Sequence, residues 1–169
     1  MEVARDENLE ALAGAVAAES DALGQLRFKF EVQQVMLSGG RSAYLDETTR
    51  ELEAAIAAVQ HADAIFRQRL SSAAVDPLGL SPESTLREVA AAAGEPWRYI
   101  FEQGRADLRR AVEAIGRLRT ENRKLLARGY LATSEALALL GVDTAGMSYD
   151  ASGAPQRGRA AATILNRRA

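Results

Sequence analysis

The chain has 169 residues, of which 47% are apolar and 26% charged, and its net charge is −2. This length and balance are typical of one folded domain and give no overall charge excess for binding nucleic acid or a membrane surface. The absence of cysteine excludes disulfides, thiolate metal sites and cysteine nucleophiles, and a single histidine excludes a zinc site built on histidines. No uncharged stretch reaches the ~18 residues of a membrane span, and the charged N-terminus is unlike a secretory signal, so we expect a cytoplasmic protein without membrane insertion.

The apolar residues are of the kinds that favour helices. The chain contains 34 alanines and 20 leucines but only nine aromatic residues. Alanine is the best helix former and leucine follows closely. The sequence therefore predicts an all-α fold with a long, thin core.

Apolar residues recur at alternating spacings of three and four in two segments of the N-terminal half. This pattern is typical of helices packed side by side as in coiled coils. The first series is Leu9, Leu12, Val16, Glu19, Leu23, Leu26, Phe30, Gln33 and Leu37. The second series is Leu45, Thr49, Leu52, Ile56, Val59, Asp63, Phe66 and Leu70.

The junction between these two series contains helix-ending residues. Gly39 and Gly40 follow Ser38, and glycine adopts the left-handed conformation that helix ends need. The heptad phase also slips there. Both observations favour a tight reversal, and a kinked continuous helix is the alternative.

Residues 71–94 form a connector interrupted by two prolines. Thr85 and Glu88 have the spacing of a capping box, which predicts a short helix that ends at Gly94. Pro96 then falls where proline is tolerated, in the first turn of a third long helix. The single tryptophan, Trp97, is expected to pack against the connector.

The third series is the longest and predicts a helix of about 45 residues, roughly 67 Å long. Its members are Trp97, Phe101, Gly104, Leu108, Ala111, Ile115, Leu118, Asn122, Leu125, Gly129, Ala132, Ala136 and Leu139. The two glycines allow close backbone approach, and Asn122 at a seam position is expected to fix the register of helix packing. The predicted fold is an elongated antiparallel bundle or coiled coil of three long helices, with a short connector helix and a flexible C-terminal tail.

Candidate catalytic and metal-binding residues are absent from these patterns. Gly39-Gly40 lacks the context of a phosphate-binding loop, and His61 has no nucleophile pattern around it. Glu47 and Glu51 lie on one helix face without further metal ligands. We therefore expect no enzyme activity, no metal and no cofactor.

The charge is unevenly distributed along the chain. Residues 1–94 carry 15 acidic and 8 basic residues, whereas residues 95–169 carry 8 acidic and 13 basic ones. Eight arginines and one lysine lie between Arg98 and Arg128. Packing of an acidic first helix beside a basic third helix explains this pattern. A nucleic-acid-binding stripe is the alternative, but no aromatic residues that stack on bases are interleaved with the arginines.

The apolar pattern stops after Leu140, which predicts a helical domain over residues 1–141 and a flexible, partner-binding tail over residues 142–169. Three candidate binding residues lie in the first part of the tail, namely Tyr149, Asp150 and Gly153. Ile164 and Leu165 follow in a basic end. Apolar residues in such segments commonly become ordered on binding a partner.

Four stretches of the chain resemble the FlgN-type flagellar export chaperones in their actinobacterial form. They are LRFKFEVQQVMLSGGRSAYLDETTRELEAAI, TLREVAAAAGEPWRYIFEQGRADLRRAV, ENRKLLARGYLATSEALALLG and YDASG. The resemblance covers roughly residues 9–169, and the segments occur in the same order. Its more discriminating part is Asn122 before two leucines, combined with the Tyr-x-x-x-Gly tail.

The resemblance implies a cytosolic chaperone of type III secretion. Such a protein binds hook–filament junction proteins and delivers them to the cytosolic domain of the export gate. The family's tyrosine beyond the last long helix corresponds to Tyr149 here and implies docking on the gate, whereas Ile164 and Leu165 are implied in cargo binding. The longer connector and the alanine-rich tail differ from the enterobacterial form. A self-associating helical scaffold is the alternative function, and the sequence leaves the oligomeric state and the cargo open.

Overall fold

The structure is a computed structural model that describes residues 2–76, 78–140, 147–149 and 155–157. Its elements are α1 (Glu2–Ser38), the 3-10 helix η1 (Ser42–Tyr44), α2 (Leu45–Val75), α3 (Leu86–Ala93), α4 (Trp97–Leu139), β1 (Met147–Tyr149) and β2 (Pro155–Arg157). The contacts divide the chain into two units, Met1–Leu125 and Leu126–Ala169, so that α4 contributes to both. The predicted fold of three long helices and one short connector helix is confirmed.

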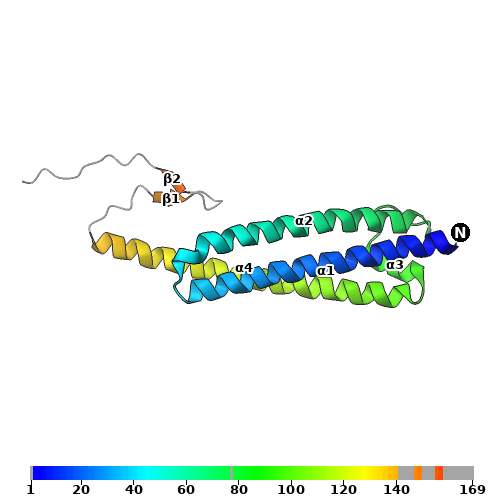
Figure 1. The fold of residues 1–169 in the computed structure, drawn as a ribbon, viewed down its shortest axis with the longest axis horizontal. Helices are drawn as coiled ribbons and strands as arrows, with labels where there is room; N and C mark the ends of the chain where they lie inside the picture. Colours follow the sequence, from blue (N-terminus) through cyan, green and yellow to red (C-terminus); the bar gives the residue numbers. More distant parts are fainter. Residues whose placement is uncertain (1, 77, 141–146, 150–154, 158–169) are drawn as a thin grey trace, which may run out of the picture. The chain divides into compact units, whose positions relative to one another are not determined.

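A tight reversal joins α1 to α2, and the two helices lie side by side (Figure 1). The Gly39 N–H donates to the Val35 carbonyl over 3.0 Å, and the Arg41 N–H donates to the Met36 carbonyl over 3.0 Å. Gly40 has a φ of 65°, in the left-handed region that favours glycine. The predicted turn is therefore correct, and the kinked continuous helix is wrong.

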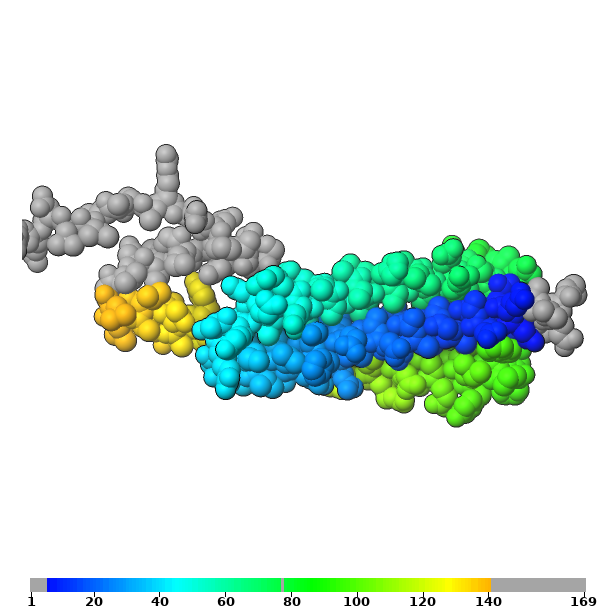
Figure 2. All heavy atoms as spheres, viewed as in Figure 1, coloured from blue at the N-terminus to red at the C-terminus, as the bar shows by residue number. Residues whose placement is uncertain are grey.

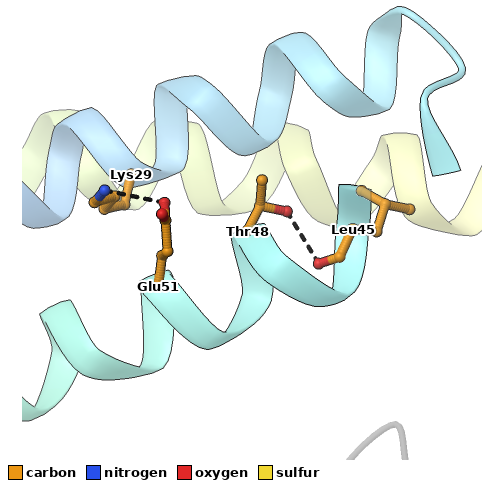
Figure 3. Close-up of polar contacts among 4 residues, drawn as sticks. All are labelled: Lys29, Leu45, Thr48 and Glu51. Carbon is orange, nitrogen blue, oxygen red and sulfur yellow. Dashed lines mark hydrogen bonds and ion pairs between the residues drawn. The ribbon is translucent and has the colours of Figure 1, made fainter. Parts of the chain in front are cut away.

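Polar contacts close to the reversal support the α1–α2 pair (Figure 3). The Lys29 Nζ lies 3.0 Å from a carboxylate oxygen of Glu51 and joins the two helices. In the first turn of α2, the Thr48 hydroxyl donates to the Leu45 carbonyl over 3.0 Å, which satisfies a side chain that would otherwise be buried without a partner.

The predicted row of α1 forms the centre of the first unit. Its members from Leu9 to Gln33 are all buried, and Leu37 is half-buried. Figure 2 shows α1 between α2 and the first part of α4. Two core clusters share this row. The first contains Leu9, Leu12, Val16, Ala73, Ala74, Leu86, Val89, Ala90, Ala93 and Phe101. The second contains Leu26, Phe30, Leu52 and Ala55, with Val59, Ile115 and Leu118 packed against it.

The predicted seam of α2 is wrong at two positions. Thr49 is exposed and Ile56 is 38% exposed, whereas the adjacent Thr48 and Ala55 are buried. Both rows obey the three-four spacing, and they differ only by a rotation of α2 about its axis. Periodicity alone does not determine that rotation, and at the second position the smaller residue, Ala55, faces the core in place of Ile56.

The connector helix forms as predicted. The Thr85 N–H donates to a carboxylate oxygen of Glu88 over 2.7 Å, and the Thr85 hydroxyl accepts from the Glu88 N–H. The hydrogen bond from the Thr85 backbone is the main reason why the pKa of Glu88 lies below its usual value. Gly94 follows the last turn with a φ of 75°. The capping box thus places the buried face of α3 against the first core cluster.

Trp97, at the start of α4, packs where the sequence predicted. It lies against the first core cluster together with the connector residues Leu78 and Leu80. Its ring stacks on Phe101 with a centroid distance of 6.0 Å, and its indole N–H donates to Asp6 over 3.3 Å. These contacts join the beginning of α4 to the connector and to α1.

Two contacts align α4 with α1. A Cβ added at Gly104 would lie only 2.4 Å from the Val16 Cγ1, so glycine is required for this approach. Further along, the Asn122 side-chain amide donates to the Phe30 carbonyl over 2.9 Å and to the Gln33 side chain over 3.0 Å. Asn122 is only 2% exposed. The predicted roles of Gly104 and Asn122 in helix packing agree with this geometry.

Glu19 is an ionisable residue within the row that α1 buries. It is 8% exposed, and one of its carboxylate oxygens has no hydrogen-bond partner among the described residues. Burial raises the pKa of Glu19, the negative charge of Asp63 raises it further, and Arg67 opposes both effects. The ionised carboxylate is therefore a local cost to stability.

We expect Gly104→Ala to destabilise the protein by about 1–3 kcal/mol, because the new methyl group overlaps Val16 and the helices must move apart. Gly14→Ala on α1 is the matched control, since no atom lies within 4 Å of a Cβ at that position. The control should stabilise the helix by up to about 1 kcal/mol. Urea denaturation followed by circular dichroism measures both changes, and equal effects of the two variants would contradict the close approach.

We expect Glu19→Gln to stabilise the protein at pH 7, because glutamine removes a buried charge. The pKa of Glu19 in the folded state lies above the ordinary value of 4.5, so folding favours the protonated form. The difference in free energy of unfolding between the wild-type protein and the variant should therefore shrink as the pH falls through the raised pKa. The two proteins should be equally stable below about pH 4.5. Denaturation midpoints at several pH values test this. A difference that stays constant with pH would show that ionisation is not its cause.

Candidate partner-binding site

The predicted binding residues of the tail are only partly within the described chain. Tyr149 ends β1, which pairs with β2 in an antiparallel register of Met147 with Arg157, Ser148 with Gln156 and Tyr149 with Pro155. Asp150, Gly153, Ile164 and Leu165 lie outside the described residues. Their binding roles remain predictions, as does the domain boundary at residue 141.

The two short strands were missed from the sequence. Each strand has only three residues, and β2 begins with a proline, which is a poor strand former. The available signal was the group Asp150, Ser152 and Gly153 between the strands, since these residue types are common in turns. Strands this short carry too little alternation to be recognised.

The last part of α4 presents large apolar side chains to solvent. Leu131 is 58% exposed, Leu139 is 89% exposed and the adjoining Leu140 is 78% exposed. Leu126 and Tyr130 are also about half exposed. Large exposed apolar surfaces usually mark sites of protein interaction.

The predicted seam of α4 is therefore wrong beyond Leu125. Gly129, Ala132, Ala136 and Leu139 are exposed, and neither core cluster of the described chain contains an α4 residue beyond Leu118. An apolar row at helical spacing looks the same whether or not another helix covers it. Sequence periodicity consequently predicted the helix but not its exposure.

We call residues 126–140, which are the last part of α4 and the adjoining Leu140, the apolar end of α4. Arg128 and Glu135 are its only charged residues. Leu126, Tyr130, Leu137 and Leu140 follow one another at spacings of four, seven and three, so they lie along one side of the helix. Such a side is suited to packing against an apolar helix or an extended apolar segment of another protein.

The described residues contain no arrangement suited to a metal ion or a membrane span. No group of three or more potential metal-ligating side chains occurs among them, and none of their helices is long and apolar enough to cross a membrane. His61 is exposed on α2.

The basic residues of α4 form their ion pairs within α4. Arg109 pairs with Glu113, Arg110 with Asp107, and Lys124 with Glu121. Among the described residues no ion pair joins α1 to α4, although the two helices are neighbours in the core. Pairing between these helices therefore does not account for the basic charge of α4.

Comparison with known proteins supports the resemblance seen in the sequence. A family model described as FlgN protein matches residues 1–157, which include all the helices, both strands and Tyr149. Comparisons with curated proteins and with solved structures find no significant match. The chain belongs to the FlgN family of flagellar export chaperones.

Proposed function

We propose that this protein binds hook–filament junction proteins in the cytoplasm and delivers them to the cytosolic domain of the flagellar export gate. The observation that carries this proposal is the exposed apolar end of α4 in a chain of the FlgN family. Binding an apolar segment of a cargo protein removes these leucines from water, which is favourable without any cofactor or chemical step. Capture and release then depend on binding equilibria alone.

Cargo binding and gate docking are assigned to different residues. The apolar end of α4, with Ile164 and Leu165, contacts the cargo. Tyr149, beside Asp150 and Gly153, contacts the export gate. The resemblance to the family supports this division, and the place of Tyr149 at the end of β1, beyond the long helix, is compatible with it.

We expect the double substitution Leu126→Ser and Leu140→Ser to weaken binding of a purified junction protein at least about tenfold, because both leucines lie on the side proposed to pack against the cargo and each buried leucine contributes on the order of 1.5–3 kcal/mol. Val35→Ser is the control, since the exposed fraction of Val35, 66%, lies between those of Leu126 and Leu140 but the residue lies on α1. Isothermal titration calorimetry measures the affinities, and circular dichroism checks the helix content. Unchanged affinity in the double variant would exclude the apolar end of α4 as the cargo site.

We expect Tyr149→Ala to leave cargo binding unchanged and to abolish binding of the cargo-loaded chaperone to the purified cytosolic domain of the gate. Tyr44→Ala is the control, because Tyr44 is an exposed tyrosine in the turn region of the first unit. Surface plasmon resonance with the immobilised gate domain compares the two variants. If the Tyr149→Ala and Tyr44→Ala variants bound the gate domain equally well, Tyr149 would be removed from the proposal. If Tyr149→Ala weakened cargo binding as much as gate binding, Tyr149 would not be specific to the gate.

A self-associating scaffold is the second candidate function. Phe28 and Val35 lie seven residues apart on α1, and more than half of each side chain is exposed. Light scattering over a range of concentrations decides between the candidates. A mass that grows with concentration, together with no binding of junction proteins, favours the scaffold, whereas a constant monomer mass contradicts it.

A further inference from the structure

The exposed face of α4 within the first unit retains basic side chains without an acidic partner. Between residues 105 and 128 the helix carries eight basic and three acidic residues. The three acidic residues already pair with Arg109, Arg110 and Lys124. Arg117, Arg119 and Arg123 are exposed and have no ion pair within the described chain. This part of α4 therefore has a net positive charge that nothing described neutralises.

A shallow hollow lies between these arginines. Its lining residues are Glu113, Gly116, Arg117, Thr120 and Glu121. No atom lies within 4 Å of a Cβ built on Gly116, so the floor of the hollow has space for a side chain from outside. We call it the Gly116 hollow.

Two arginines lie in line with the hollow along the helix axis. Arg109 precedes Gly116 by seven residues and Arg123 follows it by seven. Seven residues make nearly two turns, so all three residues lie along one side of α4, about 10 Å apart. Arg109 remains available to a partner, because its pair with Glu113 is long, at 3.8 Å, and well exposed.

The chemistry around the hollow favours a protein helix over a nucleic acid. The carboxylates of Glu113 and Glu121 line it, so the negative groups of a partner can lie only beyond them, beside Arg109 and Arg123. A helix can place its carboxylates at that separation, whereas the phosphates of a nucleic acid are closely and evenly spaced. Beside it Val112 is 57% exposed, which favours contact with an apolar side chain. No aromatic residue lies between Arg105 and Arg128 to stack on a base.

We propose that this face of α4 binds an acidic amphipathic helix of a partner protein, with a large apolar residue in the Gly116 hollow and a carboxylate seven residues to each side. The carboxylates pair with Arg109 and Arg123, while Arg117 and Arg119 flank the helix. This surface lies within the first unit and includes none of the residues assigned to cargo or gate binding. Its partner is therefore additional to those in the proposed function, and the proposal stands independently of it.

The test uses the full-length protein and a labelled synthetic helix as the probe. The peptide has about 21 residues, enough for about six turns, with a central leucine, a glutamate seven residues to each side, and alanine and glutamine elsewhere. A second peptide replaces both glutamates by lysine, and a third replaces the leucine by serine. Fluorescence anisotropy at low and at physiological salt measures the affinity of each.

We expect the first peptide to bind with a Kd below about 100 µM and the other two to bind at least about tenfold more weakly. Gly116→Leu fills the hollow and should weaken binding of the first peptide about tenfold. Gly14→Leu is the matched control, because it introduces the same side chain at another exposed, open helical glycine. Arg109→Gln and Arg123→Gln should each weaken binding about three- to fivefold, and Arg69→Gln on α2 should have no effect.

Three outcomes would overturn the proposal. The first is that the glutamate peptide shows no binding at about 100 µM, the upper limit of the expected Kd. The second is that the lysine peptide binds as tightly as the glutamate peptide, or that Gly116→Leu leaves the affinity for the glutamate peptide unchanged. The third is tighter binding of a single-stranded oligothymidylate that displaces the peptide, because the arginines would then serve a nucleic acid.

Discussion

The alignment of α4 with α1 depends on two contacts that both helices share. Gly104 allows α4 to approach Val16 more closely than any side chain at that position would permit. Eighteen residues later, the Asn122 amide is buried against the Phe30 carbonyl and the Gln33 side chain. A shift of α4 by one residue would replace glycine with a larger residue and leave the Asn122 donors unsatisfied. Buried polar contacts of this kind specify one register among several that apolar packing alone would allow.

The same alignment determines which residues of α4 remain exposed. Leu108, Ile115 and Leu118 pack against the core, so Arg109, Gly116 and Arg123 lie on the solvent side. Beyond Leu125 the helix continues with an apolar composition but with exposed side chains. One helix thus carries a buried row, a basic face and an apolar end, and the last two are available for different partners.

A chaperone of protein export holds an apolar segment and then releases it, and neither step requires bond making. Leucines on a helix are suited to this, because their binding energy comes from buried area and is tolerant of the partner's sequence. The basic face of α4 is suited instead to selective binding, since charge pairs at defined spacing favour one kind of partner.

The sequence by itself determined the elements and much of the first unit. Composition and period predicted three long helices, Gly39-Gly40 predicted the reversal, and the Thr85–Glu88 spacing predicted the cap of α3, because these features depend on residues close together in the chain. Only the tertiary structure decided the rotation of α2, which buries Thr48 and Ala55 in place of Thr49 and Ile56. It also decided that the apolar row of α4 is exposed beyond Leu125 and that, among the described residues, the arginines of α4 form no ion pair with α1. These properties depend on which side chains of distant segments meet, and a periodic pattern within one helix carries no information about its neighbours.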